Sequence, residues 1–297
     1  MKEFEYLEPT TVSEACGLLR RYDGEARVYA GGAYLSIVMK QGFLQPKALV
    51  NIKGIKELKG IHFDPAAGLT LGALVTHHEL ETSEVARERL PILREVEREV
   101  ANIRVRNVAT VGGNLASGEP LTDLPQVFIS LDARVKISGP SGERVIRLDE
   151  LFVDYYQTSL ADDEILTHVV VPPLPARSGI EYIRFSSSSV IDKPCVGVAI
   201  RITLEPGSEA CKDVRVVLGC VAPTPLRARK AEEILEGNPL TAELAARAAA
   251  SAGEECSPTS DLRGSAEYKR GVVRALVKRA ALQAYERALQ EGDSPSR

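Results

Sequence analysis

The chain has 297 residues, of which 44% are hydrophobic and 26% are charged. These proportions are close to those of soluble globular proteins, so they exclude a disordered, collagen-like or low-complexity chain. The net charge of −4 supplies no positive field for nucleic acid or acidic lipid, and neither partner is expected. The length predicts two domains, or three if a small subdomain is counted.

The N-terminal part alternates short helices and strands. Thr11 and Glu14 fit a capping box, which predicts a helix over 12–21. A strand over 27–30 ends in a first glycine pair, Gly31-Gly32, and a helix can begin directly after it. The next expected elements are that helix at 33–39, strands at 48–50 and within 60–75, and a helix at 90–100.

A second glycine pair, Gly112-Gly113, is expected in a turn after this last helix. The elements expected beyond it are a helix at 124–131, a hairpin with strands at 133–137 and 144–146, and a strand at 164–171. The proline-rich stretch 172–175 can continue neither a helix nor a central strand. A domain boundary is therefore expected near residue 177.

The rest of the chain has longer β runs followed only by helices. The expected strands are 180–185, 195–204 and 213–220, and the expected helices are 226–235, 241–252 and 265–289. This order predicts a separate α+β domain over 177–290 and a tail over 291–297, after an N-terminal domain over 1–176.

Cysteine and hydropathy patterns limit the possible cofactors and location. The five cysteines are widely spaced and include no CxxC pair, so a disulfide framework, a zinc site or an iron–sulfur cluster held by this chain alone is disfavoured. No apolar run approaches the roughly 18 residues of a membrane span. The start MKEFEYLEPTT is acidic where a signal peptide is basic and then apolar, so a cytoplasmic location is expected.

The two glycine pairs are the first candidates for a ligand site. Consecutive backbone amides that point into one concavity form an anion nest, which can hold a diphosphate without basic side chains. A single glycine pair is more often an ordinary tight turn, but here two pairs are flanked by small residues. Neither has the GxGxxG or Walker A spacing, so an ordinary Rossmann or P-loop site is not indicated.

The segments AGGAYL (30–35), RNVATVGGNLA (106–116) and LTDLP (121–125) resemble the FAD-binding subunit of the molybdenum hydroxylases. This family includes the medium chain of aerobic carbon monoxide dehydrogenase and the flavin subunit of xanthine dehydrogenases. The resemblance continues through GALVTH (72–77), DEIL (163–166) and GSAEYKR (264–270), and so spans nearly the whole chain.

The resemblance implies an α+β fold and a set of cofactor contacts. The fold would be a two-subdomain FAD-binding domain of the vanillyl-alcohol-oxidase (PCMH) type, with subdomains over 1–55 and 56–176, followed by a C-terminal α+β domain like that of the carbon monoxide dehydrogenase flavoprotein. Asp123 would hydrogen-bond an FAD hydroxyl, and Leu166 and Arg184 would lie by the isoalloxazine, where an adjacent cation raises the flavin potential. The residues surrounding the diphosphate would be Ala30, Gly31, Gly32, Ala33, Tyr34, Thr110, Val111, Gly112, Gly113 and Asn114.

The chain departs from the family pattern in three places. Ala33 and Tyr34 stand where relatives usually carry hydroxyl, histidine or acidic side chains, which leaves the contribution of side chains to the diphosphate open. The serine run 186–189 replaces an arginine-rich stretch, and Arg184 replaces a common lysine. The cluster-binding cysteine insertion of one branch of the family does not occur in this sequence.

Simpler structural roles are open for several of these residues. Asp123 before Leu124-Pro125 could be a helix N-cap. The adjacent His77 and His78 do not easily face one metal ion. Cys195 and Cys220 are expected in the core, and the basic residues of the last helix are expected on its solvated face, namely Lys269, Arg270, Arg274, Lys278 and Arg279.

The resemblance implies an electron-transfer subunit with no catalytic residue of its own. FAD would collect electrons from the [2Fe–2S] clusters of a small partner subunit and pass them to NAD or a quinone, while a large partner subunit carries molybdopterin, in a dimer of heterotrimers. Carbon monoxide is the favoured substrate of the complex, and xanthine, an aldehyde or another heterocycle is the alternative. Two rival hypotheses are a stand-alone flavin oxidase or reductase and a flavin-free scaffold subunit.

Overall fold

The structure is a computed structural model that describes residues 2–189 and 192–292. It divides into two compact units. The first contains the chain up to Glu119 together with Ala133–Val171, and the second contains Pro120–Asp132 together with the chain from Pro172 onward. A short segment of the domain expected over 1–176 thus packs with the C-terminal part of the chain. Of the expected tail, residues 293–297 lie outside the described residues.

The first unit begins with a small parallel sheet in the strand order β1-β3-β2. Its elements are β1 (Glu5–Leu7), α1 (Val12–Arg21), β2 (Ala26–Tyr29), α2 (Leu35–Lys40) and β3 (Ala48–Asn51). The predicted bounds of α1 are confirmed, and the Thr11 hydroxyl accepts from the Glu14 amide at 3.1 Å. The reciprocal half of the predicted capping box is wrong, because the Glu14 carboxylate accepts from the Thr10 amide instead, at 2.7 Å.

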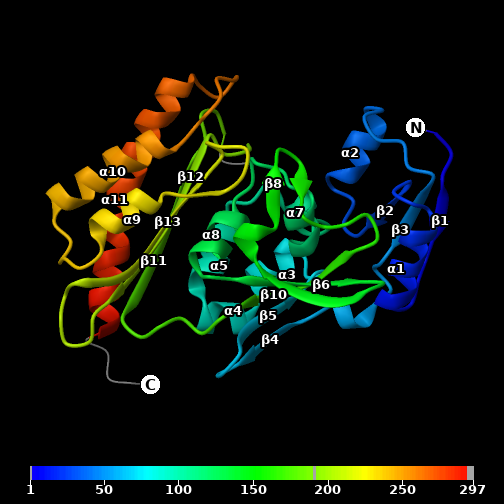
Figure 1. The fold of residues 1–297 in the computed structure, drawn as a ribbon, viewed down its shortest axis with the longest axis horizontal. Coiled ribbons are helices and arrows are strands. Elements are labelled where there is room, and N and C mark those ends of the chain that lie inside the picture. Colours follow the sequence, from blue (N-terminus) through cyan, green and yellow to red (C-terminus); the bar gives the residue numbers. More distant parts are fainter. Residues whose placement is uncertain (1, 190–191, 293–297) are drawn as a thin grey trace. The chain divides into compact units, whose positions relative to one another are not determined.

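An antiparallel sheet in the order β4-β5-β10-β6-β7 forms the other half of the first unit (Figure 1). Its strands are β4 (Ile61–Asp64), β5 (Gly68–Gly72), β6 (Arg134–Gly139), β7 (Gly142–Arg147) and β10 (Ile165–Val171), and a separate pair is formed by β8 (Phe152–Asp154) and β9 (Gln157–Thr158). The connecting helices are η1 (Lys56–Leu58), α3 (His77–Thr82), α4 (Glu84–Arg89), α5 (Pro91–Glu97), α6 (Ile103–Arg106), α7 (Val111–Ala116) and η2 (Leu148–Glu150).

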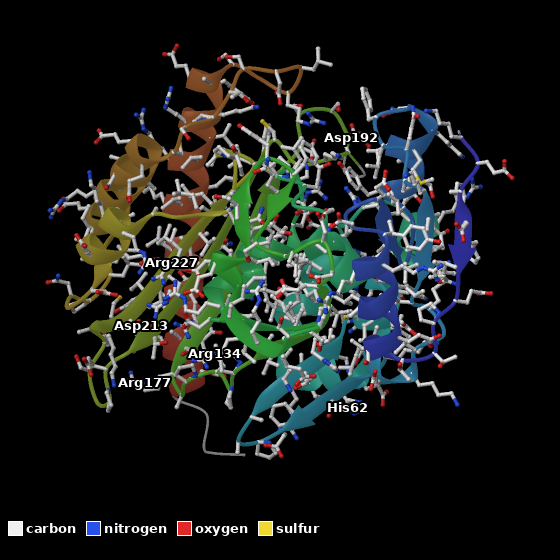
Figure 2. The ribbon with its side chains drawn as sticks, turned by 45° about the vertical axis from the view of Figure 1, so that its right-hand side comes forward. His62, Arg134, Arg177, Asp192, Asp213 and Arg227 are labelled. Atoms are coloured by element: carbon white, nitrogen blue, oxygen red, sulfur yellow. The ribbon has the colours of Figure 1, made fainter. Side chains whose placement is uncertain are left out.

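The second unit is built on an antiparallel sheet in the order β11-β12-β13-β14. Its elements are α8 (Leu124–Ser130), β11 (Ser178–Phe185), β12 (Val196–Leu204), β13 (Cys211–Gly219), β14 (Leu226–Arg227), α9 (Arg229–Leu235), α10 (Ala242–Glu255) and α11 (Ala266–Gly292). Figure 2 labels Asp213 and Arg227, which come from the adjacent strands β13 and β14. The predicted helix start at Leu226 is wrong, because Leu226 pairs with Leu218 in the sheet.

Both faces of this sheet are covered. Val198, Ile200 and Ile202 of β12 pack into the hydrophobic core with α9, α10 and α11. The alternate residues of β12 point to the opposite face, and α8 packs against β12 and β13 there. The whole of β12 is therefore buried, which explains why its sequence reads as a continuous apolar run.

Lys269 corrects the expected solvated face of the last helix. It is 1% exposed, and its ammonium group donates to the Thr259 carbonyl and pairs with Asp261, both at 2.9 Å. The first turn of α11 packs on this loop, so the charge is buried only because it is paired. Arg274, Lys278 and Arg279 are exposed as predicted.

The described residues hold neither a disulfide nor a membrane-spanning helix. All five cysteines are buried, as expected for Cys195 and Cys220, and none forms a disulfide among the described residues. No helix in the described ranges is long and apolar enough to cross a bilayer. Within the same ranges, no group of three or more His, Cys, Asp or Glu side chains is placed to hold a metal ion.

Candidate functional site

The first glycine loop connects β2 to α2 and carries free backbone donors. Within residues 2–189 and 192–292, the amides of Gly31, Gly32, Ala33 and Tyr34 donate no hydrogen bond to the chain. These residues are partly or well exposed to solvent. Gly32 has a φ of +71°, which a glycine adopts at low cost. Successive unpaired amides with one residue in the left-handed region are what an anion nest requires.

Gly31 brings this loop against the segment that precedes the second glycine pair. A Cβ at Gly31 would lie 2.0 Å from the Val108 carbonyl oxygen and 2.8 Å from the Ala109 Cα. The contact is between two backbones, so no side-chain rotation could relieve it. The segments AGGAYL (30–35) and RNVATVGGNLA (106–116), which begin about 75 residues apart in the sequence, therefore lie side by side in the first unit.

The second glycine pair does not form the predicted turn. It lies in the first turn of helix α7, whose N-cap is Thr110. The Gly113 amide donates to the Thr110 hydroxyl at 3.1 Å. The amides of Val111 and Gly112 donate to carbonyls of the 73–75 segment at 2.8 and 3.0 Å. The second half of the predicted anion nest is wrong, because the amides of residues 111–113 are already used within the chain.

The second glycine pair instead lets α7 pack closely against the end of β5 and leaves the exposed face at Gly113 without a side chain. A Cβ on Gly112 would lie 2.5 Å from the Ala73 Cβ, so Gly112 lets α7 approach the end of β5. Gly113 is exposed, and a Cβ there would meet only the Thr110 Oγ1, at 2.9 Å. The Asn114 Oδ1 is buried and has no hydrogen-bond partner within the described ranges. Asn114 thus offers an unused acceptor beside the two motifs.

Tyr34 has a contact that the sequence did not indicate. Its ring stacks on Tyr156, with centroids 6.0 Å apart and planes 10° from parallel. Tyr156 has a φ of +57°, and its hydroxyl donates to the buried Glu119 at 3.3 Å. Burial, followed by the negative charge of Glu119, raises the pKa of Tyr34. The departure from the family pattern at Tyr34 therefore supplies an aromatic anchor for the first glycine loop.

Leu166 lies on β10 in the first unit. It pairs with Ile137 of β6 and is 4% exposed. The next residue of the strand, Thr167, accepts the Ala73 amide at 2.8 Å, which places β10 beside the GALVTH motif. The strand that follows from the DEIL motif is thus linked to the GALVTH motif by a backbone hydrogen bond.

Asp123 and Arg184 are brought together in the second unit. The Asp123 Oδ1 accepts from the Tyr182 hydroxyl at 2.7 Å and lies 3.5 Å from the Arg184 Nε. The side chains of Arg184 and Asp123 are 5% and 6% exposed. Asp123 occupies the N-cap position of α8, as the simpler alternative predicts, but its side chain makes no capping hydrogen bond there.

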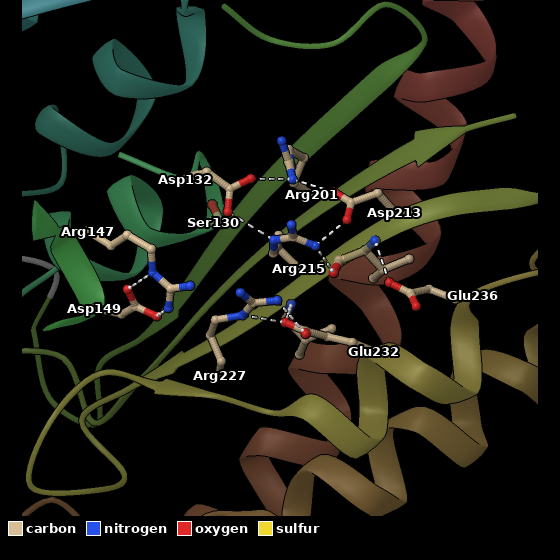
Figure 3. Close-up of polar contacts among 12 residues, drawn as sticks. Ser130, Asp132, Arg147, Asp149, Arg201, Asp213, Arg215, Arg227, Glu232 and Glu236 are labelled. Atoms are coloured by element: carbon tan, nitrogen blue, oxygen red, sulfur yellow. Dashed lines mark hydrogen bonds and ion pairs between the residues drawn. The ribbon is translucent and has the colours of Figure 1, made fainter. Parts of the chain in front are cut away.

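A second polar cluster fixes the other end of α8 (Figure 3). Asp132 accepts from the Arg201 Nη2 at 2.7 Å and from the Arg215 Nε at 3.0 Å, and both arginines also pair with Asp213. Arg201 is 3% exposed, and burial lowers its pKa while the two aspartates oppose that shift. Nothing in the sequence singled out this cluster, because its members lie far apart in the chain. It anchors the inserted segment to the sheet.

The two adjacent histidines have separate partners. The His77 Nδ1 lies 2.8 Å from the Glu97 Oε2, and both side chains are buried. The His78 Nδ1 lies 3.4 Å from the Glu81 Oε2 on the same helix. Both histidines lie in the first turn of α3. Their contacts are structural pairs within the first unit.

Comparison with known proteins defines the class. Residues 2–174 match the family described as the FAD binding domain in molybdopterin dehydrogenase, and residues 182–284 match the CO dehydrogenase flavoprotein C-terminal domain. The chain belongs to this family of molybdopterin dehydrogenase flavoproteins, and the resemblance and fold class predicted from the sequence are confirmed.

Individual relatives are dehydrogenase subunits. The carbon monoxide dehydrogenase medium chain of Hydrogenophaga pseudoflava is 34% identical, with 96% of this chain and 98% of the relative covered. The putative xanthine dehydrogenase FAD-binding subunit of Escherichia coli K12 is 26% identical over 94% of this chain and 95% of the relative. The carbon monoxide dehydrogenase structure from H. pseudoflava matches with a TM-score of 0.92 at 35% identity, covering 96% of this chain and 98% of that one. This chain is thus an oxidoreductase component, the FAD subunit of a molybdenum hydroxylase-type complex.

Proposed function

We propose that this chain relays electrons in such a complex. Its FAD receives electrons from [2Fe–2S] clusters of a small partner subunit and passes them to NAD or a quinone, and a large partner subunit holds the molybdenum cofactor. The observation that carries the FAD site is the row of unpaired amides at residues 31–34, since anions bind where backbone donors are free. The complex is proposed to be a cytoplasmic dimer of heterotrimers.

The chain's own residues are proposed to bind and orient the cofactor. The amides of Gly31, Gly32, Ala33 and Tyr34 would donate to the diphosphate, and Gly113 would leave room beside it. Ala30 and the start of α7, with Thr110, Val111, Gly112 and Asn114, would complete the wall around the diphosphate. Bound FAD would supply the redox chemistry, so no general acid or base is required from the protein.

Other residues are proposed to contact the remaining parts of FAD. Asp123 would accept a hydrogen bond from a cofactor hydroxyl. Leu166 and Arg184 would lie by the isoalloxazine, where the guanidinium can donate to the ring carbonyls. The short 3.5 Å separation of Asp123 and Arg184 supports a shared role for these two buried charges.

Carbon monoxide is the proposed substrate of the whole complex. Two carbon monoxide dehydrogenase medium chains are 34% and 32% identical to this chain over 96% of its length, against 26% for the xanthine dehydrogenase subunit. A nicotine 6-hydroxylase medium subunit from Paenarthrobacter nicotinovorans is 33% identical, so a heterocycle is the alternative substrate class. The substrate would bind on the molybdenum subunit, which makes this part of the proposal separable from FAD binding.

The test is co-expression with the genes of the two partner subunits, followed by anaerobic addition of carbon monoxide, xanthine, nicotine or an aldehyde while flavin absorbance is recorded. We expect carbon monoxide to bleach the flavin in the complex and not in this chain alone. Bleaching of the isolated chain would instead support a stand-alone flavoenzyme. A colourless chain that takes up no FAD would support the scaffold hypothesis. Light scattering of the purified complex measures its subunit stoichiometry.

A further inference from the structure

We propose that Tyr182 is a positioning residue of the flavin site, which holds the Asp123 carboxylate against Arg184 and thereby sets the potential of the bound flavin. The proposal rests on the proposed function, because Asp123 and Arg184 are assigned to FAD there. Tyr182 and Arg184 are two residues apart on β11, so both side chains point to the same face of the sheet. Asp123 precedes α8, which packs on the sheet.

A pair of glycines makes room for this arrangement. Gly197 of β12 and Gly219 of β13 lie opposite each other in the register of the sheet. A Cβ at Gly197 would lie 2.8 Å from the Tyr182 hydroxyl oxygen, and a Cβ at Gly219 would lie 1.5 Å from the Gln126 Nε2. The absence of side chains at Gly197 and Gly219 therefore leaves a notch in the sheet. The notch receives the hydroxyl end of Tyr182 and the side-chain amide of Gln126 from α8.

The notch fixes Asp123 from two directions. Gln126 is 1% exposed, and its amide nitrogen also donates to the Thr122 carbonyl at 2.7 Å, next to Asp123 in the chain. The Tyr182 hydroxyl donates to the Asp123 Oδ1 from the sheet side at 2.7 Å. The carboxylate is thus held both by the start of α8 and by the strand that carries Arg184.

Tyr182 acts here as a neutral donor. Burial, followed by the charge of Asp123, raises the pKa of Tyr182 well above its ordinary value, so the phenol keeps its proton. Because the donor is neutral, the pair of Asp123 and Arg184 contributes no net charge to its surroundings. Arg184 then acts on the flavin as one half of an ion pair rather than as an isolated cation, which refines the expectation that it raises the flavin potential.

The proposal gives opposite signs for two nearly isosteric substitutions. Asp123→Asn removes the negative charge that lies 3.5 Å from the Arg184 Nε, so the midpoint potential of the bound flavin should rise. Tyr182→Phe removes the hydrogen bond that partly neutralises the negative charge of the Asp123 carboxylate. The carboxylate then acts more strongly on the flavin, so the midpoint potential should fall. Tyr182→Phe should also weaken FAD binding by up to about tenfold, because the Asp123 carboxylate that is proposed to bind FAD loses the hydrogen bond that fixes its position.

The experiment measures the FAD dissociation constant and the flavin midpoint potential for wild type, Tyr182→Phe, Asp123→Asn and the double variant. The matched control is Tyr285→Phe, since the Tyr285 hydroxyl donates to the Glu209 carbonyl at 2.9 Å in the same unit without contacting Asp123. We expect Tyr182→Phe to change the potential of the wild type and not that of the Asp123→Asn background. An unchanged potential in Tyr182→Phe, or equal effects in both backgrounds, would overturn the proposal.

A second variant covers the case in which Tyr182→Phe does not fold. Gly197→Ala keeps the phenol of Tyr182 but places a Cβ 2.8 Å from its hydroxyl oxygen, so the ring must shift away from Asp123 and the potential should change in the same direction as in Tyr182→Phe. No shift in a folded Gly197→Ala protein would contradict the positioning role. If the wild type binds FAD and neither variant changes the flavin potential, this inference alone is contradicted. If the wild type does not bind FAD, the proposed function is contradicted.

Discussion

The two glycine pairs of the first unit have the same dipeptide sequence and opposite uses of their backbone. After β2, the amides of residues 31–34 are unpaired among the described residues. At the start of α7, the amides of residues 111–113 are all engaged within the chain. At α7 the Thr110 hydroxyl accepts one of these amides and the carbonyls of the 73–75 segment accept the other two, whereas Tyr29, at the position before Gly32 that matches Thr110, is not a capping residue type. A glycine pair is therefore a candidate anion site only where neither a capping side chain nor a neighbouring carbonyl already accepts its amides.

The largest expected effect is at Gly31. Gly31→Val would force a side chain into the Val108 carbonyl, 2.0 Å from the Cβ position, and a backbone group cannot move aside cheaply. We expect a loss of about 3 kcal/mol or more in the free energy of unfolding, with FAD binding abolished. Urea denaturation and flavin fluorescence measure the two quantities. Wild-type stability in this variant would show that the two motifs do not pack as described.

Gly32→Ala should have the next largest effect. It places a side chain at a φ of +71° and brings the new Cβ within 2.5 Å of the Tyr29 ring. We expect a cost of about 1 to 3 kcal/mol in unfolding free energy and a loss of FAD affinity, because the amides of the loop would turn away from a common point. Unchanged FAD affinity in a measurably destabilised Gly32→Ala protein would argue against the nest.

Thr110→Val tests the role of the N-cap at the second glycine pair. It removes the hydroxyl that caps α7 while keeping the shape of the side chain. We expect a loss of about 1 kcal/mol in unfolding free energy and a smaller change in FAD affinity than in Gly32→Ala. Thr110→Ser keeps the hydroxyl and is the matched control. A larger effect on FAD than on stability would mean that the hydroxyl serves the cofactor rather than the helix.

Glu164→Gln probes an ion pair in the first unit that involves neither glycine pair. Arg144 donates to both Glu164 oxygens, at 2.7 and 2.8 Å, and this contact lowers the pKa of Glu164. A carboxyl whose pKa is lowered on folding stabilises the protein above the unfolded-state pKa of about 4.3, and that stability is lost as the pH falls through the lower folded-state value. We expect Glu164→Gln to cost at most about 1 kcal/mol at neutral pH, since Arg144 is partly exposed.

The check is a series of unfolding curves between neutral pH and acid. The stability difference between wild type and Glu164→Gln should shrink in acid, and FAD affinity at neutral pH should stay the same. A difference that grows in acid would reverse the assigned sign of the pKa shift.

The smallest expected effect is at Gly113. Gly113→Ala adds a Cβ on an exposed face that meets only the Thr110 Oγ1, at 2.9 Å. The helix propensity gained and the crowding of the cap oppose each other, so we expect a stability change within about 0.5 kcal/mol. It is the matched control for Gly32→Ala, the same substitution in the first glycine pair. A loss of stability comparable to that of Gly32→Ala would contradict the difference between the two pairs.

Much of the fold could be predicted from the sequence where elements are long or strongly patterned. The bounds of α1 and the strands that became β3, β10 and β12 follow from capping and apolar runs. Helix α7 was missed because its six residues are too few for a helical period and contain two glycines. The burial of Lys269 was missed because it depends on a loop about ten residues earlier in the chain, not on the pattern of its own helix.

The candidate site was predictable only in part for a similar reason. Local motifs singled out Gly31, Gly113 and Asp123, but their partners come from distant segments. Tyr156 and Tyr182 meet Tyr34 and Asp123 only after the chain has folded. Such contacts leave no spacing signal in a single sequence. Tyr182 had the weaker signal of standing two residues before Arg184 on one strand, which places both on the same face.

The central claim is that the first glycine loop holds the diphosphate of FAD, and competition between cofactor fragments tests it directly. Dissociation constants of FAD, FMN and riboflavin are measured for the purified, flavin-free wild type and for Gly32→Ala. If two or more loop amides bind the phosphates, FAD should bind at least about 100-fold more tightly than riboflavin to wild type, and this ratio should collapse in Gly32→Ala. Equal affinities for FAD and riboflavin in the wild type would contradict the claim.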